Sequence, residues 1–283
     1  MRRKKNYTWL ILVTVILFSL FVMGFVSIKK PEEIALMRIA GRVTAEVLDI
    51  MRDAVRPGIT TGELDRLAEE HIRRNNGIPA FKNYRPMTDM TPFPGTICAS
   101  INDEVVHGIP DFSRVLEEGD IISVDVGAYV NGWCGDAACT YPVGAISPER
   151  RKLLEVTEDS LNRAIAQATT GHTLGDIGHA VEGYVMPLGY GVVRDYTGHG
   201  IGKKMHEAPQ IPNYGKAGQG MTLKAGMTIA IEPMIMSGRE EVRVGANGWT
   251  VLTVDGSDAA HFERTVAVFD DGPEILTKWQ SCR

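Results

Sequence analysis

Apolar positions recur every three or four residues after Pro31, and this spacing predicts an amphipathic helix with one buried face. Proline in the first turn, with Glu32 and Glu33 beside the positive end of the helix dipole, favours this start. Pro57-Gly58 predicts the end of the helix. The expected buried positions are Leu36, Ala40, Val43, Val47 and Met51.

A second helix is predicted to follow directly. Thr60 and Glu63 have the spacing of a capping box, in which each side chain bonds the backbone N–H of the other residue. Asn76-Gly77 predicts its end, and a strand-rich stretch is expected from about residue 95 to residue 143. The expected inward-facing positions are Leu64, Leu67, Ala68 and Ile72.

The second half of the chain repeats this order of elements. A helix predicted from about 148 to 168 leads into TGHTLGDI, which matches the PGITTGEL that precedes the earlier helix. The spacing of Leu116, Gly119 and Asp125 also returns, in Leu223, Gly226 and Glu232. Matched patterns in the same order indicate an internal duplication. We therefore expect one domain, residues 29–283, with two similar α/β halves at about 31–145 and 146–277 around one site.

The first 28 residues differ from the rest in composition. An uncharged run from Trp9 to Ile28 follows four basic residues, Arg2, Arg3, Lys4 and Lys5. About 20 apolar residues suffice to cross a bilayer. The run meets Lys29 without the small-residue site of a cleaved signal peptide. We therefore expect a basic N-terminus and an uncleaved transmembrane helix within residues 1–28, the helix spanning residues 9–28.

Overall composition narrows the class of protein. With 283 residues, 44 % of them hydrophobic, the chain can bury a large core. A net charge of -5 and the absence of a basic stripe after residue 42 argue against a nucleic-acid surface, so no direct nucleic-acid binding is expected. The four cysteines have no CxxC spacing, and we expect free thiols.

Two aspartates fall on one face of a predicted β-hairpin. Asn131-Gly132 is a preferred pair for a two-residue type I′ turn, which fixes the register of the strands on either side. Counting back from this turn, Gly127 lies opposite Asp136, and Asp125 and Asp136 become diagonal neighbours. Carboxylates this close repel each other unless a cation lies between them. The alternative is a pair of solvated aspartates on an exposed face.

Two glutamates interrupt apolar stretches. Glu232 divides MTIAI from PMI, a stretch expected to be buried, where an unpaired carboxylate would cost several kcal/mol. Glu263 lies in HFERTVAV, where Arg264 offers another explanation as an ion-pair partner.

Three histidines accompany these acids. His199 lies in TGHGIG, whose glycines permit close backbone approach, while His206 follows seven residues later and His107 lies on a loop. A lone loop histidine is usually a surface residue. Taken together, however, two Asp, two Glu and a His suit a pair of divalent ions such as Co, Mn, Fe or Zn. Such a pair provides the chemistry that amide hydrolysis requires.

These motifs resemble the type I methionine aminopeptidases. The resemblance covers about residues 27–277 and rests on VDVGAYVNGWCGD, GHGIGKKMHEAPQIPNY, IEPM and FERT. It implies a pseudo-two-fold pita-bread α/β fold and a metalloaminopeptidase activity. It further implies that Asp136 and Glu263 bridge two metal ions, that Asp125 completes one ion, and that His199 and Glu232 complete the other.

The resemblance also implies roles beyond metal ligation. Glu232 matches a general base, and His107 and His206 match residues that bind the substrate and stabilise the developing oxyanion. Phe93, Cys98 and Trp249 match the wall of a methionine pocket, although ordinary core packing would explain apolar residues equally well. Residues 85–91 are an apparent insertion that leaves the role of Tyr84 open. Arg264 stands where many relatives have histidine.

The implied substrates are the N-termini of newly made proteins that have a small second residue. A Xaa-Pro peptidase and a non-catalytic binding protein of the same fold remain alternatives. We expect a monomer close to the ribosome with its catalytic domain in the cytoplasm, held to the membrane through residues 9–28. The alternative is a soluble protein that starts at Met23, because MGFVSIK resembles the start of a soluble family member. Charge does not decide the orientation in the membrane. Four cations precede the apolar run, and four others follow it, Lys29, Lys30, Arg38 and Arg42.

Overall fold

The first two helices begin where the sequence signals place them. A computed structural model describes residues 26–85 and 91–280. Helix α2 (Pro31–Ala54) has Pro31 in its first turn, and helix α3 (Thr61–Arg74) carries the complete Thr60–Glu63 capping box. All the expected inward positions are buried except Leu36 and Leu67, which are half-buried.

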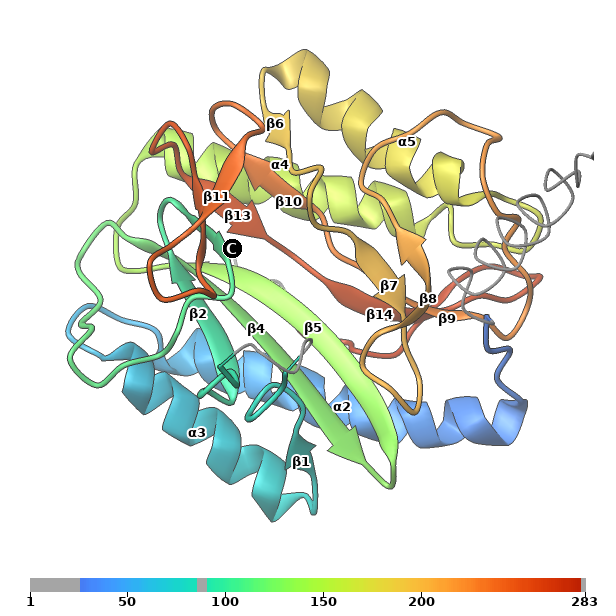
Figure 1. The fold of residues 1–283 in the computed structure, drawn as a ribbon, viewed down its shortest axis with the longest axis horizontal. Helices are drawn as coiled ribbons and strands as arrows, with labels where there is room; N and C mark the ends of the chain where they lie inside the picture. Colours follow the sequence, from blue (N-terminus) through green and yellow to red (C-terminus); the bar gives the residue numbers. More distant parts are fainter. Residues whose placement is uncertain (1–25, 86–90, 281–283) are drawn as a thin grey trace, which may run out of the picture.

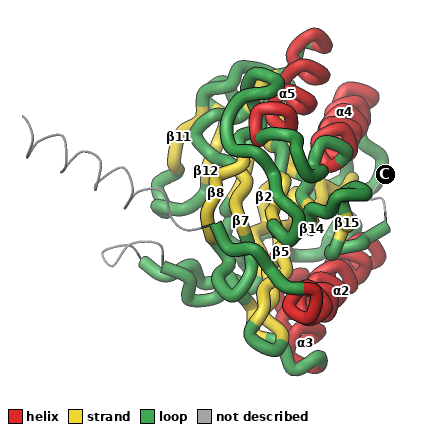
Figure 2. Tube along the Cα trace, turned by 90° about the vertical axis from the view of Figure 1, so that its right-hand side faces the viewer, coloured by secondary structure: helices red, strands yellow, loops and turns green. Residues whose placement is uncertain are grey.

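The second pair of helices follows the same pattern. Helix α4 (Pro148–Ile165) ends three residues before the expected 168, and helix α5 (Leu174–Val185) continues into a short 3₁₀ turn, η1 (Met186–Leu188). A capping box between Thr173 and Asp176 begins α5, as Thr60 and Glu63 begin α3. The four helices lie on one side of the strands, with α2 and α3 at one end and α4 and α5 at the other (Figure 2).

Within the described residues the strands pair into antiparallel sheets (Figure 1). One sheet joins β1 (Ile78–Pro79), β4 (Ile121–Val130) and β2 (Ile97–Ile101), with β5 (Trp133–Pro142) paired to β4. Another has the order β15 (Glu274–Ile275), β14 (Arg264–Ala267), β9 (Thr228–Ile231), β7 (Gly198–Gly200) and β8 (Glu207–Ile211). The smaller sheets are β13 (Ala259–His261), β10 (Met234–Met236) and β6 (Gly191–Val192), and β11 (Val242–Val244), β12 (Val251–Thr253) and β3 (Glu104–Val106).

The β4–β5 hairpin has the expected register. Gly127 pairs with Asp136, and Asp125 pairs with Ala138. Asn131 (φ 52°) and Gly132 (φ 78°) both adopt the left-handed conformation that a type I′ turn requires. Helix α2 packs against both strands of the hairpin and so helps to hold it in place.

Corresponding hydrogen bonds occur in both halves of the chain. The Gly58 N–H donates to Leu116 O at 2.8 Å, and the Gly171 N–H donates to Leu223 O at 3.1 Å. Isolated antiparallel bridges also correspond: Thr60 with Val115, and Thr173 with Thr222. These paired contacts agree with the expected pseudo-two-fold arrangement.

One expectation needs correction, and another concerns residues that the structure mostly does not describe. Cys139 is disulfide-bonded, whereas Cys98 and Cys134 are free, so the expectation of free thiols is wrong for Cys139. The expected transmembrane helix over residues 9–28 lies almost wholly outside the described residues, and its described end, residues 26–28, is not helical. Among residues 26–85 and 91–280, no helix is long and apolar enough to cross a membrane.

Candidate active site

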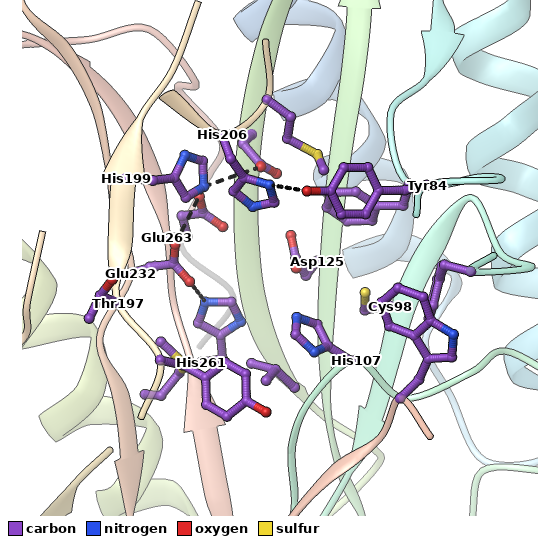
Figure 3. A pocket seen from close by; sticks show the side chains of 18 of the residues that line it. Tyr84, Cys98, His107, Asp125, Thr197, His199, His206, Glu232, His261 and Glu263 are labelled. Carbon is purple, nitrogen blue, oxygen red and sulfur yellow. Dashed lines mark hydrogen bonds and ion pairs between the residues drawn. The ribbon is translucent and has the colours of Figure 1, made fainter. Parts of the chain in front are cut away.

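The five expected metal ligands line a single cavity. Its volume is about 360 Å³, and its wall also contains the expected substrate residues His107, His206, Phe93, Cys98 and Trp249. Asp125 and Asp136 project from β4 and β5, and His199 projects from β7. Glu232 lies in the break between β9 and β10, and Glu263 in the break between β13 and β14. The tertiary structure thus brings the β4–β5 hairpin, β7 and the two breaks to one place (Figure 3).

The ligand atoms are spaced for shared coordination. His199 Nε2 lies 3.6 Å from Glu232 Oε1 and 3.8 Å from Asp136 Oδ2. Two triads have ligand atoms within 4.8 Å of one another, and both contain Glu263: Asp136, His199 and Glu263, and Glu232, His261 and Glu263. Glu263 is therefore placed between two groups of donors. Asp125 belongs to neither triad, although it faces the same cavity.

The carboxylates lack the partners that buried charges require. Asp125 Oδ1, Asp136 Oδ1 and Glu263 Oε1 are buried without a hydrogen-bond partner in the described part of the chain. Burial raises the pKa of Asp125 to about 7 and the pKa of Glu232 to about 8. Burial, together with repulsion from neighbouring carboxylates, raises the pKa of Asp136 and of Glu263 well above the usual range. A cation would relieve this cost, so the oxygen-rich donor set fits divalent metal ions.

This arrangement predicts a pH-dependent stability for the metal-free protein. Asp125 and Glu232 have higher pKa values in the folded protein than in an unfolded chain, so the folded state binds more protons and loses stability as pH rises through about 7 and about 8. The buried histidines, whose pKa values are lowered, oppose this trend in part near pH 6.5, where an unfolded histidine is about half protonated, but no longer above about pH 7.5, where they are neutral in both states. Thermal unfolding should show a Tm at least about 5 °C lower at pH 8.5 than at pH 6.5 after chelation. With saturating Mn²⁺ the decrease should be smaller, and an equal decrease would contradict the role of the cation.

His107 and His206 face the cavity as neutral imidazoles. His107 has a left-handed backbone (φ 60°), which is uncommon for a residue other than glycine and directs its ring between Trp249 and Tyr196. Burial, with smaller contributions from His261 and His206, lowers the pKa of His107 to about 4. Burial also lowers the pKa of His206.

Tyr84 contacts His206 directly. The Tyr84 hydroxyl lies 2.8 Å from His206 Nδ1, and the ring of His206 lies 4.4 Å from that of His199, measured between centroids. Figure 3 shows His206 between these two side chains. With the tyrosine hydroxyl as donor, the neutral ring carries its proton on Nε2. Tyr84, whose role the sequence left open, therefore holds the orientation of His206.

The apolar wall of the cavity contains the three residues expected there. Phe93 packs edge-on against Trp249 at 5.2 Å between centroids, and the Trp249 indole N–H donates to Thr91 O at 2.9 Å. Cys98 on β2 pairs with Asp125 on β4, so the thiol lies beside one of the expected metal ligands. Burial raises the pKa of the Cys98 thiol, which keeps it neutral. The aromatic wall and the carboxylates thus belong to one site.

Arg264 does not act as the partner of Glu263. Its guanidinium donates to Thr277 O at 2.6 Å and to Trp279 O at 3.1 Å, and it lies 3.5 Å from the centre of the Trp279 ring. Arg264 therefore binds the C-terminal segment instead, which removes the alternative explanation for Glu263.

Sequence reasoning missed His261, Tyr196 and Met205, which also line the cavity. His261 could have been found, because side chains two positions apart in extended backbone point to the same side, and Glu263 is two positions later. Tyr196 and Met205 have no comparable local signal.

Comparisons with known proteins agree with this geometry. The model of metallopeptidase family M24 matches residues 35–270. A methionine aminopeptidase of Clostridium acetobutylicum is 53 % identical over 252 residues, which cover 89 % of this chain and 98 % of that protein. Methionine aminopeptidase 1 of Bacillus subtilis is 49 % identical over 250 residues, with 88 % and 98 % covered. The crystal structure of methionine aminopeptidase from Rickettsia prowazekii superposes with a TM-score of 0.86 at 42 % identity, covering 90 % of this chain and all of that one. With the family model matched over most of its length and these relatives at 42 to 53 % identity, the chain belongs to metallopeptidase family M24, among the methionine aminopeptidases.

Proposed function

We propose that this protein removes the initiator methionine from other proteins by metal-dependent hydrolysis of the first peptide bond. One observation carries the proposal: Asp125, Asp136 and Glu263, each with one carboxylate oxygen that has no hydrogen-bond partner among the described residues, line the same cavity as the apolar wall. The carboxylates suit divalent ions, and the wall suits an unbranched thioether side chain.

The proposed ligands are the five residues that the resemblance implied. Asp136 and Glu263 would bridge two ions, which accords with the position of Glu263 in both triads. His199 and Glu232 would complete one ion, and Asp125 the other. Two bound divalent ions would polarise the scissile carbonyl and lower the pKa of the attacking water.

The remaining steps are proposed for residues of this chain. Glu232 would accept the proton of the attacking water and pass it to the departing amine. His206, fixed by Tyr84 at 2.8 Å, would donate a hydrogen bond to the oxyanion that develops on the substrate. His107 would hold the substrate beside Trp249, its neighbour at 6.2 Å between ring centroids. Phe93, Cys98 and Trp249 would enclose the methionine side chain.

The proposal predicts a specific pattern of peptide cleavage. Purified protein depleted of metal should be inactive, and added Co²⁺ or Mn²⁺ should restore release of methionine from Met-Gly-X peptides. Release from Met-Leu-X peptides should be much slower, as the family resemblance implies for a small second residue. Preferential cleavage of X-Pro peptides would replace the proposal with a Xaa-Pro peptidase, and no metal-dependent release from any peptide would favour a binding protein.

We also propose that the domain acts in the cytoplasm, as a monomer close to the ribosome, because newly made N-termini emerge there. Lys29 is 4 % exposed, its ammonium group lies 2.7 Å from Glu207, and Val26 packs against the core, so residues before 29 already belong to the folded domain. An anchor ending at residue 28 would leave no linker, which favours a chain that starts at Met23. N-terminal sequencing of the cellular protein, with protease treatment of intact cells, tests this. A full-length chain digested from outside would contradict the cytoplasmic placement.

The division of the domain into halves at about 31–145 and 146–277 is likewise a proposal. The matching bonds of Gly58 and Gly171, and the matching bridges of Thr60 and Thr173, support it.

A further inference from the structure

His261 is a buried histidine whose ring has no hydrogen bond. The residue is 1 % exposed, and neither ring nitrogen has a hydrogen-bond partner within residues 26–85 and 91–280. A polar group that is buried without a partner destabilises the folded state. A ligand from outside the described residues would remove this cost.

The backbone of His261 is fixed while its ring points into the cavity. The His261 N–H donates to Thr140 Oγ1 at 2.9 Å, and Thr140 Oγ1 donates to His261 O at 2.9 Å. On the other edge of β13, His261 pairs with Met234 of β10. Figure 3 shows the ring directed at Glu232 from the side opposite His199. This position is held by the sheet and by Thr140 of the neighbouring strand β5.

The Nε2 atoms of His261 and His199 lie at the same distance from the Glu232 carboxylate. His261 Nε2 lies 3.6 Å from Glu232 Oε2, and His199 Nε2 lies 3.6 Å from Glu232 Oε1. This distance is too long for an N–H···O hydrogen bond, whose usual range is about 2.7 to 3.2 Å. Two ligands bound to one ion at about 2.1 Å lie roughly 3.0 to 3.6 Å apart. His261 is therefore spaced as a co-ligand of Glu232.

We propose that His261 is a sixth protein ligand of the metal centre, bound through Nε2 to the ion that Glu232 and Glu263 share. One ligand atom each of Glu232, His261 and Glu263 lies within 4.8 Å of the other two. The ion completed by His199 thereby gains a second nitrogen donor, and Glu232 is held between two imidazoles. This inference rests on the proposed assignment of Glu232 and Glu263 as ligands.

Full-length protein stripped of metal and titrated with Co²⁺ provides the test. Coordinated histidines give exchangeable, strongly shifted N–H proton signals in the NMR spectrum of a Co²⁺ protein, and the wild type should show one each for His199 and His261. His261→Gln and His261→Ala should each lose one signal, change the visible Co²⁺ absorption, and weaken binding of one ion by at least about tenfold. His71→Gln is the matched control, since His71 contacts Glu46 on helix α2 and does not line the cavity.

The outcomes separate this inference from the proposed function. His261→Gln retaining both signals, the visible spectrum and the Co²⁺ affinity would overturn it, because glutamine can replace a hydrogen bond but cannot replace an imidazole ligand. A wild type that binds no pair of Co²⁺ ions would refute the proposed metal site and this inference with it. Circular dichroism checks that each variant is folded, and His261→Gln, which conserves much of the volume, decides the matter if His261→Ala does not fold.

Discussion

Asp136→Asn and Glu263→Gln should each remove most of the bound metal and reduce kcat/KM by about 10³-fold or more. Both substitutions keep the shape of the side chain and remove its charge. Asp136 is 3 % exposed and Glu263 is 2 % exposed, so no other anionic group can move in easily from solvent. Loss of the ions would remove several kcal/mol of transition-state stabilisation, and each 1.4 kcal/mol is about tenfold in rate.

Metal content by mass spectrometry and methionine release from a Met-Gly-X peptide provide the measurement. Asp53→Asn is the control, because Asp53 is an exposed residue of helix α2 whose ion pair with Arg52 lies outside the cavity. Circular dichroism should show that all three variants are folded. If Asp136→Asn or Glu263→Gln retained both metals and turned over normally, the bridging roles would be wrong.

His206→Ala should lower kcat by about 10²-fold while the metal content stays unchanged. Removing a single donor to a developing oxyanion has an effect of about this size. Unlike Asp136 and Glu263, His206 belongs to neither triad of donor atoms, so its loss should leave the ions in place. The measurement is kcat and KM by peptide release, with metal analysis of the same sample. A parallel loss of metal would show that His206 is a ligand.

Tyr84→Phe tests whether Tyr84 only orients His206, which is the residue that would donate the hydrogen bond to the oxyanion. The variant keeps the ring beside His206 and removes only the hydroxyl that lies 2.8 Å from Nδ1. A hydrogen bond of about 1 kcal/mol corresponds to about a fivefold decrease in kcat, with little change in KM. A loss as large as that of His206→Ala would mean that Tyr84 itself contacts the reacting atoms.

Local signals in the sequence were sufficient for the helices and for the hairpin. The capping boxes at Thr60 and Thr173 begin α3 and α5, because the residues that fix a helix start are its own neighbours. Asn131-Gly132 likewise fixed the pairing of Gly127 with Asp136, since a two-residue turn leaves only one register. The resemblance, and not spacing alone, supplied the complete set of proposed ligands.

Local signals did not predict the contacts of side chains whose partners lie far away in the sequence. Arg264 was a plausible ion-pair partner for its neighbour Glu263, but the sheet directs it toward Thr277 and Trp279. Tyr84 and His206 are 122 positions apart, so no local pattern indicated their hydrogen bond. The alternation of side chains along a strand determines which face of the sheet a residue points to. It does not determine which other residues lie against that face.

The sequence by itself determined which residues form helices, which face of the hairpin carries Asp125 and Asp136, and that Glu232 interrupts a buried stretch. Only the tertiary structure decided that β4, β5, β7 and the breaks after β9 and β13 converge on one cavity of about 360 Å³. It alone also placed Nε2 of His261, whose ring has no hydrogen bond within the described part of the chain, 3.6 Å from Glu232. The reason is physical: backbone conformation and the facing of side chains depend on near neighbours, whereas distances between segments are set by the packing of the whole core.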